Sequence, residues 1–212
     1  MNILIAGANG TTGQELVKRL VSAGHTVKAG VRAPEQIAKM RDMGAKGVLL
    51  DLTKPDLFPS ALEDVDQVVF TAGSGGKALE AVDRDGAISL IDATARASVP
   101  KFVMLSSVLV DEPEKGPDNL QNYFAAKKAA DDHLKQSGLD YAIVRPVALT
   151  NDDATGKITS GDLDLEGTSI PRADVAHVLQ LAIESQGATS EIIEISSGDM
   201  PINNLLKSEL AA

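Results

Sequence analysis

Short runs of consecutive apolar residues alternate with amphipathic stretches along the whole chain. Runs such as those in 67–73 and 101–107 are apolar at consecutive positions, which is typical of strands buried on both faces. The stretches between them repeat apolar residues every three or four positions, as Leu16, Val17 and Leu20 do, and therefore predict helices. The predicted strands are 2–7, 26–31, 47–51, 67–73, 101–107, 141–146 and 191–197, and the predicted helices are 13–23, 83–98, 121–137 and 172–185.

This alternation predicts the fold class. Strand–helix repeats require right-handed crossovers, which give an α/β, doubly wound parallel sheet of about seven strands with helices on both faces. We find no internal repeat or low-complexity linker, so we expect residues 1–212 to form a single domain. Ligands bind at the carboxyl ends of strands in such sheets, so we expect a small substrate-side region built from loops 108–122 and 147–171.

A glycine-rich turn, GANGTTG, leaves the first predicted strand and enters the first predicted helix. Gly7, Gly10 and Gly13 permit a tight turn, close approach of the backbone to a pyrophosphate, and close helix–strand packing. The helix N-terminus then offers unpaired N–H groups to the phosphates. No Lys-Ser or Lys-Thr follows the glycines, so the ATP-type phosphate loop is a poor match. The turn predicts a dinucleotide site, with a turn that binds no ligand as the alternative.

The residue after the second strand indicates which dinucleotide is bound. This position carries Arg32, where an acidic residue would accept the ribose 2′-hydroxyl of NAD. Because Arg pairs with a 2′-phosphate, we expect NADP in preference to NAD, although Arg32 could instead face only solvent. Asp51 and Leu52 end the third strand and could contact the adenine. Gly73 follows the fourth strand and has no side chain to obstruct the cofactor.

Composition and charge exclude several classes of function. The chain has no cysteine, which removes disulfides, thiol catalysis and thiolate metal sites. Its formal net charge of −10 argues against a nucleic-acid partner. No apolar run approaches the roughly 20 residues that cross a bilayer, and the first apolar stretch has no basic leader. We therefore expect a cytoplasmic protein, monomer or homodimer, that acts on a small molecule and has no membrane partner.

The order of motifs resembles the short-chain dehydrogenase/reductase superfamily, in its atypical branch of NAD(P)-binding, epimerase/dehydratase-like proteins. The matching motifs are the glycine turn, Asp51-Leu52, TAGSGG at 71–76, LSS at 105–107, Tyr123-x-x-x-Lys127, VRP at 144–146 and RADVA at 172–176. The resemblance implies a Rossmann fold that binds a nicotinamide cofactor. The cofactor-binding residues that we predict are Gly7, Asn9, Gly10, Thr11, Thr12, Gly13, Arg32, Asp51, Leu52, Ala72, Gly73, Ser74, Lys127 and Pro146.

The same resemblance implies a catalytic trio. Tyr123 would be the general acid/base, Lys127 would hold the ribose and stabilise the phenolate, and Ser107 would orient the substrate carbonyl, with Ser106 as the alternative serine. A phenol of pKa about 10 needs such a cation to act near neutral pH. Residues four apart project from one helix face, and this face is apolar at its deeper positions. Lys128 belongs to the opposite, solvent-facing side.

These observations predict an NADP-dependent oxidoreductase that transfers hydride between the cofactor and a small carbonyl or alcohol. An NADP(H)-binding redox sensor without turnover, and an epimerase or isomerase with bound cofactor, are the alternatives. We predict no metal site. Other charged residues have structural interpretations: Asp83 and Asp85 as an exposed helix start, Arg172 and Asp174 as capping and dipole complementarity at a helix start, and Arg145 as a strand end whose backbone contacts the nicotinamide.

Overall fold

A nine-stranded sheet forms the centre of the computed structural model, which describes residues 1–212 except 162, 166, 186–189 and 206–212. The strand order is β11-β8-β10-β6-β5-β4-β1-β2-β3. The strands are β1 (Asn2–Ala6), β2 (Thr26–Val31), β3 (Lys46–Leu49), β4 (Gln67–Phe70), β5 (Lys101–Leu105), β6 (Asp140–Pro146), β8 (Lys157–Ser160), β10 (Glu191–Ser197) and β11 (Met200–Pro201).

All the predicted strands are present, and every pairing between them is parallel. β5 is buried at every position because helices cover both of its faces. The chain runs outwards from β1 to β3 in one direction and from β4 to β10 in the other. This reversal beside β1 brings the glycine turn and the ends of β4 and β5 to one edge of the sheet, where a doubly wound fold binds its ligand. The predicted fold class is confirmed.

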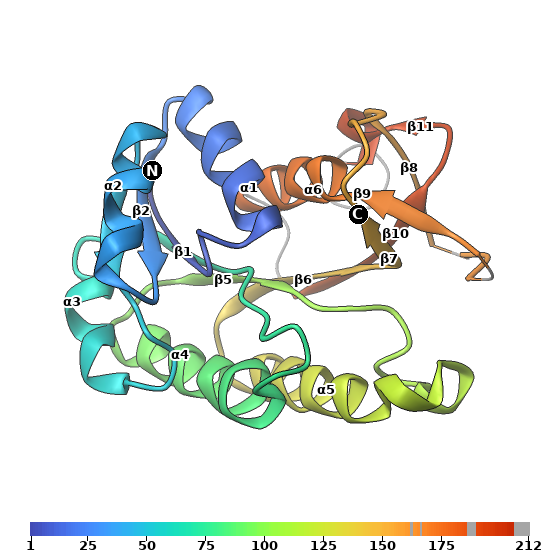
Figure 1. Ribbon diagram of the computed structural model, residues 1–212, viewed down its shortest axis with the longest axis horizontal. Helices are drawn as coiled ribbons and strands as arrows, with labels where there is room; N and C mark the ends of the chain where they lie inside the picture. The colour runs from blue at the N-terminus through green and yellow to red at the C-terminus, as the bar shows by residue number, and fades with distance from the viewer. Residues whose placement is uncertain (162, 166, 186–189, 206–212) are drawn as a thin grey trace.

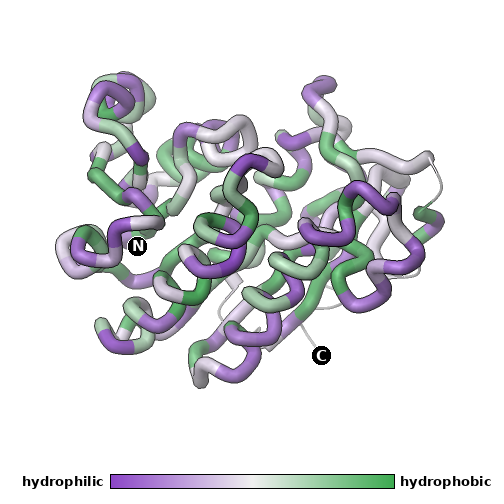
Figure 2. Tube along the Cα trace, turned by 60° about the horizontal axis from the view of Figure 1, so that its bottom comes forward, coloured by the Kyte–Doolittle hydropathy of each residue, from purple (hydrophilic) through white to green (hydrophobic). Residues whose placement is uncertain are grey.

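Helices cover both faces of the sheet, with α1 and α6 on one side and α4 and α5 on the other (Figure 1). Hydrophilic and hydrophobic positions are interspersed along the helices (Figure 2), and the buried positions of the four longer helices are mostly apolar, so these helices present an apolar side to the strands. The helices are α1 (Thr11–Ser22), α2 (Ile37–Asp42), α3 (Phe58–Leu62), α4 (Asp85–Arg96), α5 (Gln121–Gln136) and α6 (Arg172–Glu184).

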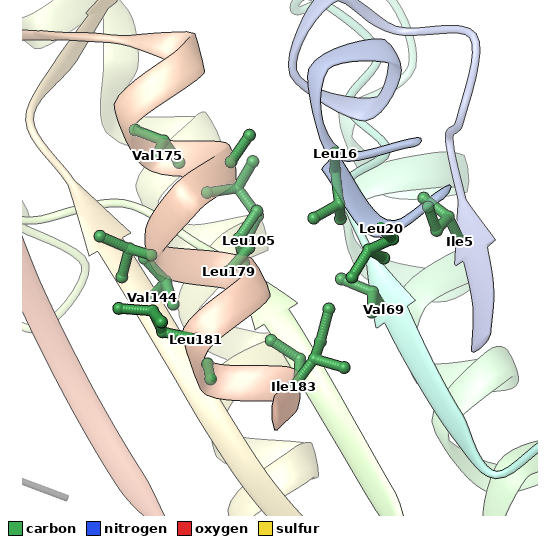
Figure 3. Close-up of a cluster of buried hydrophobic side chains, with 14 of the residues drawn as sticks. Ile5, Leu16, Leu20, Val69, Leu105, Val144, Val175, Leu179, Leu181 and Ile183 are labelled. Carbon is green, nitrogen blue, oxygen red and sulfur yellow. The ribbon is translucent and has the colours of Figure 1, made fainter. Parts of the chain in front are cut away.

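The core beneath α1 and α6 joins the two halves of the fold (Figure 3). Leu16 and Leu20 of α1 pack in one cluster with Leu179 and Ile183 of α6, over side chains of β1, β4, β5 and β6. A second cluster, between the strands and α3, α4 and α5, contains Phe70 among others. Among the described residues, no helix is long and apolar enough to cross a membrane.

The prediction of about seven strands was too low, and the sheet is not entirely parallel. Segment 151–169, part of the loop 147–171 that we expected, contains β8, which pairs antiparallel with β10 and with β11. It also leads into β9 (Ser169–Pro171), which forms a separate two-stranded sheet with β7 (Ala148–Thr150). β8 finds its partner more than thirty residues later along the chain, so no local turn signal marks the pair.

Candidate functional site

The glycine turn between β1 and α1 leaves no space for side chains. A Cβ atom on Gly7, whose φ is +85°, would lie 2.6 Å from the backbone of Ala72 at the end of β4. A Cβ atom on Gly13 would overlap the carbonyl oxygen of Gly7. The N–H of Ala8 donates to the carbonyl of Gly30 in β2, at 3.1 Å. Neighbouring strands therefore hold the turn in one shape.

The N-terminus of α1 has the properties of an anion site. Its N-cap is Gly10, which is exposed, and no side chain caps the helix. The first turn has no acidic residue, so nothing there opposes a bound phosphate. Thr11 is exposed, Thr12 is buried, and the carbonyl of Asn9 accepts a hydrogen bond from Gln14 at 2.6 Å. A backbone cradle with free N–H groups fits the pyrophosphate of a dinucleotide.

The predicted adenosine-side residues lie at the carboxyl ends of β2 and β3. Gly30 pairs in register with Ala6, so Arg32 follows β2 on the same edge as the glycine turn. Arg32 is exposed and forms no ion pair with any described residue. Asp51 accepts hydrogen bonds from Thr53; burial raises its pKa, but these bonds and the charge of Lys54 outweigh that effect and lower it. Leu52 is buried in the core.

A buried carboxylate holds the loop that follows β4. Asp83 is only 1% exposed, and its Oδ2 accepts the N–H of Ser74 at 3.1 Å. The expectation that Asp83 lies on an exposed helix start is therefore wrong. It belongs to a π-helical segment, Leu79–Arg84, whose wider turns direct the side chain inwards below Gly73. Asp85, by contrast, is exposed and pairs with Arg84.

Lys127 is a buried charged residue of the site with specific contacts. Its side chain is buried, with the residue 4% exposed, and Nζ donates to the carbonyl oxygen of Leu105 at 3.0 Å. Nζ also lies 5.6 Å from the centre of the Phe70 ring and 6.0 Å from that of Tyr123. Tyr123 is half-buried in the first turn of α5. α5 thus brings the Tyr–Lys pair to the carboxyl ends of β4 and β5.

The two serines after β5 have different surroundings. Ser106 is buried and donates its hydroxyl to Asp131 Oδ2 at 2.9 Å. Ser107 is half-buried, and its hydroxyl makes no hydrogen bond with the described residues. The next residue, Val108, donates its N–H to the carbonyl of Pro146 at 3.2 Å, which fixes the chain beyond Ser107 to the end of β6.

The sequence analysis missed the buried ion pair behind these residues. We expected Arg145 to make contacts through its backbone. Its guanidinium is instead buried and pairs with Asp131 at 3.0 Å. Asp131 follows Lys127 by four residues, on the same buried helix stripe. A carboxylate buried on this stripe needs a nearby cation, so the position of Asp131 in the sequence could have predicted a buried ion pair.

The substrate-side loops are held by specific contacts. Gly116 allows the loop after β5 to approach Phe124, since a Cβ there would lie 2.5 Å from the ring. In the other loop, Asp174, at the first turn of α6, accepts the N–H and hydroxyl of Thr155 and the N–H of Gly156. No side chain in the described part of the chain caps α6, so the expectation of capping by Arg172 and Asp174 is wrong. Among the described residues, no group of three or more His, Cys, Asp or Glu side chains could hold a metal ion.

Comparison with known proteins gives relatives along most of the chain. The profile of a family described as NAD(P)H-binding matches residues 7–186. The Bacillus subtilis protein named uncharacterized sugar epimerase YhfK is 36% identical over 214 residues, covering 98% of this chain and 99% of that protein. The Synechocystis photosystem II assembly factor Ycf39 is 30% identical over 148 residues, which is 68% of this chain and 44% of that protein.

A solved structure agrees with the sequence relatives. The crystal structure of the oxidoreductase ylbE from Lactococcus lactis has a TM-score of 0.91 and 32% sequence identity, covering 100% of this chain and 98% of that one. The similarity therefore includes the glycine turn, the ends of β4 and β5, and the substrate-side loops.

Proposed function

The chain belongs to the NAD(P)H-binding family, in the atypical branch of the short-chain dehydrogenase/reductase superfamily, and from this premise we propose that it is an NADP-dependent oxidoreductase. Its substrate would be a small carbonyl compound or the corresponding alcohol. The observation that carries the proposal is the burial of Lys127 between the carbonyl of Leu105 and the rings of Phe70 and Tyr123. A buried ammonium beside a phenol is costly unless its charge is used.

Tyr123, Lys127 and Ser107 support proton transfer to the carbonyl oxygen of the substrate. A nicotinamide cofactor held at the glycine turn and by Lys127 would supply or accept the hydride. In the reductive direction, Tyr123 donates its Oη proton to the substrate carbonyl oxygen, and the Lys127 ammonium stabilises the phenolate that remains. Ser107 donates a hydrogen bond to the same carbonyl oxygen and orients it. Ser106 is the weaker candidate for this role because its hydroxyl already donates to Asp131.

The preference for NADP rests on Arg32. Its side chain is exposed beside the glycine turn and has no carboxylate partner among the described residues. A guanidinium in that position suits the ribose 2′-phosphate, with which it can form charge-assisted hydrogen bonds. The backbone cradle of Gly7, Gly10 and Gly13 would hold the pyrophosphate.

Binding and turnover measurements test the proposal together. The fluorescence of the reduced nicotinamide can report the affinities for NADPH and NADH. We expect NADPH to bind at least about tenfold more tightly than NADH. We also expect NADPH oxidation with at least one member of a panel of aldehydes, ketones, quinones and flavins. Tight NADPH binding without oxidation by any of them would contradict the reductase proposal and favour a redox sensor.

An epimerase is the second candidate, because the Bacillus subtilis relative is named as a sugar epimerase. An epimerase returns the hydride to its substrate, so its cofactor shows no net oxidation. The protein incubated with nucleotide sugars in deuterated water, and followed by NMR, separates the two functions. We expect no inversion of a sugar stereocentre, and inversion without net NADPH consumption would overturn the reductase proposal.

A further inference from the structure

Asp131 is fully buried in α5, one helical turn beyond Lys127. Its Oδ2 accepts hydrogen bonds from Ser106 Oγ at 2.9 Å and from Arg145 Nε at 3.1 Å. Its Oδ1 is buried and has no hydrogen-bond partner among the described residues. The carboxylate is therefore satisfied on one side and unpaired on the other.

Arg145 connects this buried carboxylate to the surface. Its side chain is only 4% exposed, and Nη2 lies 3.0 Å from Asp131 Oδ2. Its Nη1 points the other way, donating to Asp111 Oδ2 at 2.6 Å and lying 3.5 Å from Glu194 Oε1. Asp111 also pairs with Lys128 at 2.8 Å. The guanidinium thus has a defined orientation, held from both ends.

Two cations, Arg145 and Lys127, lie near Asp131, and Arg145 is the one that forms an ion pair with it. Residues four apart on a helix face are neighbours, so Lys127 lies beside Asp131. Burial raises the pKa of Asp131, and the charge of Arg145, the hydroxyl of Ser106 and the charge of Lys127 offset that rise only in part. Without Arg145, the buried carboxylate would need another cation, and Lys127 is the one available. Lys127 instead points to Leu105 and the Tyr123 ring.

We propose that Arg145 is a positioning residue, which holds Asp131 on Ser106 and so leaves the Lys127 ammonium on the Leu105 carbonyl, facing Tyr123. Arg145 touches none of the reacting groups. It acts through Asp131 on Lys127, and through Lys127 on the phenol. The proposal rests on the proposed function only in assigning Tyr123 as the proton donor. The electrostatic linkage from Arg145 through Asp131 and Lys127 to the Tyr123 phenol requires no substrate.

The other charged groups near α5 are engaged elsewhere or exposed. The elements that pack against α5 are β4, β5, β6, α4, the π-helical segment Leu79–Arg84 and two short helical turns in 113–120. Their charged side chains are Asp83 on Ser74, Arg84 on Asp85, Asp92 on His133, Lys101 on the carbonyls of Ala182 and Ser185, Lys115 on Glu112, and the exposed Glu80, Arg96, Glu114, Asp118 and Asp140. Arg145 is therefore the cation that competes with Lys127 for Asp131.

Ionisation of Tyr123 can be observed directly, because the chain contains two tyrosines and no tryptophan. Tyr141 is half-buried, its hydroxyl forms no hydrogen bond among the described residues, and Tyr141→Phe makes Tyr123 the single phenol. In this background, the ultraviolet absorbance of the phenolate is followed against pH. Arg145→Met should move the midpoint upwards by roughly half a pH unit or more, because Asp131 then draws the Lys127 ammonium away.

The matched variants move the midpoint in different directions. Asp131→Asn keeps an acceptor for Ser106 and removes the negative charge, so the midpoint should fall by a similar amount. Arg145→Lys keeps a cation and should return the midpoint most of the way to that of the parent. Circular dichroism across the titration confirms that each variant is folded. Should Arg145→Met fail to fold, Asp131→Asn still tests the linkage.

A purely structural role for the pair gives a different result. In that case the folded variants lose thermal stability while the Tyr123 midpoint stays the same in all of them, and this result would overturn the proposal. The titration uses neither cofactor nor substrate. A failed search for carbonyl substrates together with shifted midpoints would therefore contradict the proposed function while leaving the linkage intact.

Discussion

Lys127 and Leu105 are joined by a buried hydrogen bond of 3.0 Å, from the side-chain ammonium to the main-chain carbonyl oxygen. This bond fixes α5 to the carboxyl end of β5. The chain contains a comparable bond elsewhere: Lys101, at the start of β5, donates to the carbonyls of Ala182 and Ser185 at the C-terminus of α6. The two buried lysines are alike in chemistry and differ in position, which makes one a control for the other.

Lys127→Met should weaken NADPH binding by at least about tenfold, because it removes a charged hydrogen-bond donor from the cofactor side of the sheet. The variant should also lose about 1–3 kcal/mol of unfolding free energy, since the Leu105 carbonyl loses its donor. Lys101→Met should show a similar loss of stability with unchanged NADPH affinity. Equal NADPH affinity in both variants would show that Lys127 does not bind the cofactor. Urea unfolding and nucleotide fluorescence measure the two quantities.

Gly10→Ala should separate binding from folding. A Cβ at this exposed N-cap would lie 3.2 Å from the Gly7 carbonyl, and its φ of −67° suits alanine. We expect a stability change within about 1 kcal/mol and a loss of NADPH affinity of at least about tenfold, because the methyl group occupies the path of the pyrophosphate. Gly24→Ala is the control: its φ is +83° and nothing lies near its Cβ, so it should destabilise the fold without affecting binding. An unchanged NADPH affinity in Gly10→Ala would argue that phosphate does not bind at this turn.

Arg32→Ala should reduce the affinity for NADPH by about tenfold to a hundredfold and leave that for NADH nearly unchanged, since only the former carries the 2′-phosphate. Arg41→Ala removes the same charge from an exposed position on α2 and controls for net charge. Calorimetric titration with both nucleotides measures the ratio. Parallel losses for NADPH and NADH would show that Arg32 does not read the 2′-phosphate.

Asp111 should contribute an acid-sensitive part of the stability. The hydrogen bond from Lys128 and the pairing with Arg145 lower its pKa from 3.8 to about 2. A carboxylate with a lowered folded-state pKa stabilises the fold above its unfolded-state pKa, and that contribution disappears as the pH falls from about 4 to about 2. The side chain is 46% exposed, so solvent screening limits the effect to about 1 kcal/mol.

Unfolding free energies of the parent and of Asp111→Asn, measured by urea denaturation between mildly acidic and strongly acidic pH, test this linkage. The parent should be the more stable above about pH 4, and the two curves should converge as the pH falls towards about 2. A constant difference across this range would show that the Asp111 pairs do not stabilise the folded state.

The sequence predicted the parts of the fold that depend on local pattern. The bounds of β2 and β10 agree with the apolar runs because both strands carry β-branched residues next to clear turn signals. The burial of Lys127 agrees with the helical periodicity of α5. The short helices α2 and α3 were missed because they span fewer turns than the pattern needs to be recognised.

The remaining features depend on contacts between distant segments. Asp83 is buried because a π-helical segment changes the helical phase by a fraction of a turn, which a regular periodicity of 3.6 does not describe. The pairing of Arg145 with Asp131 joins β6 to α5. In the sequence, each of these charged residues could equally be a solvent-exposed side chain. The hydrogen bonds from Thr155 and Gly156 to Asp174 likewise form only when α6 packs beside the β7–β8 loop.

The most direct test of the central claim is the turnover of Tyr123→Phe with a carbonyl substrate that the parent reduces. The variant lacks the Oη proton and keeps the ring, so NADPH affinity should stay within a factor of about two of the parent. The rate of NADPH oxidation at saturating substrate should fall by about a hundredfold to ten-thousandfold. An unchanged rate in a variant that binds NADPH normally would contradict the assignment of Tyr123 as the proton donor, and with it the proposed mechanism.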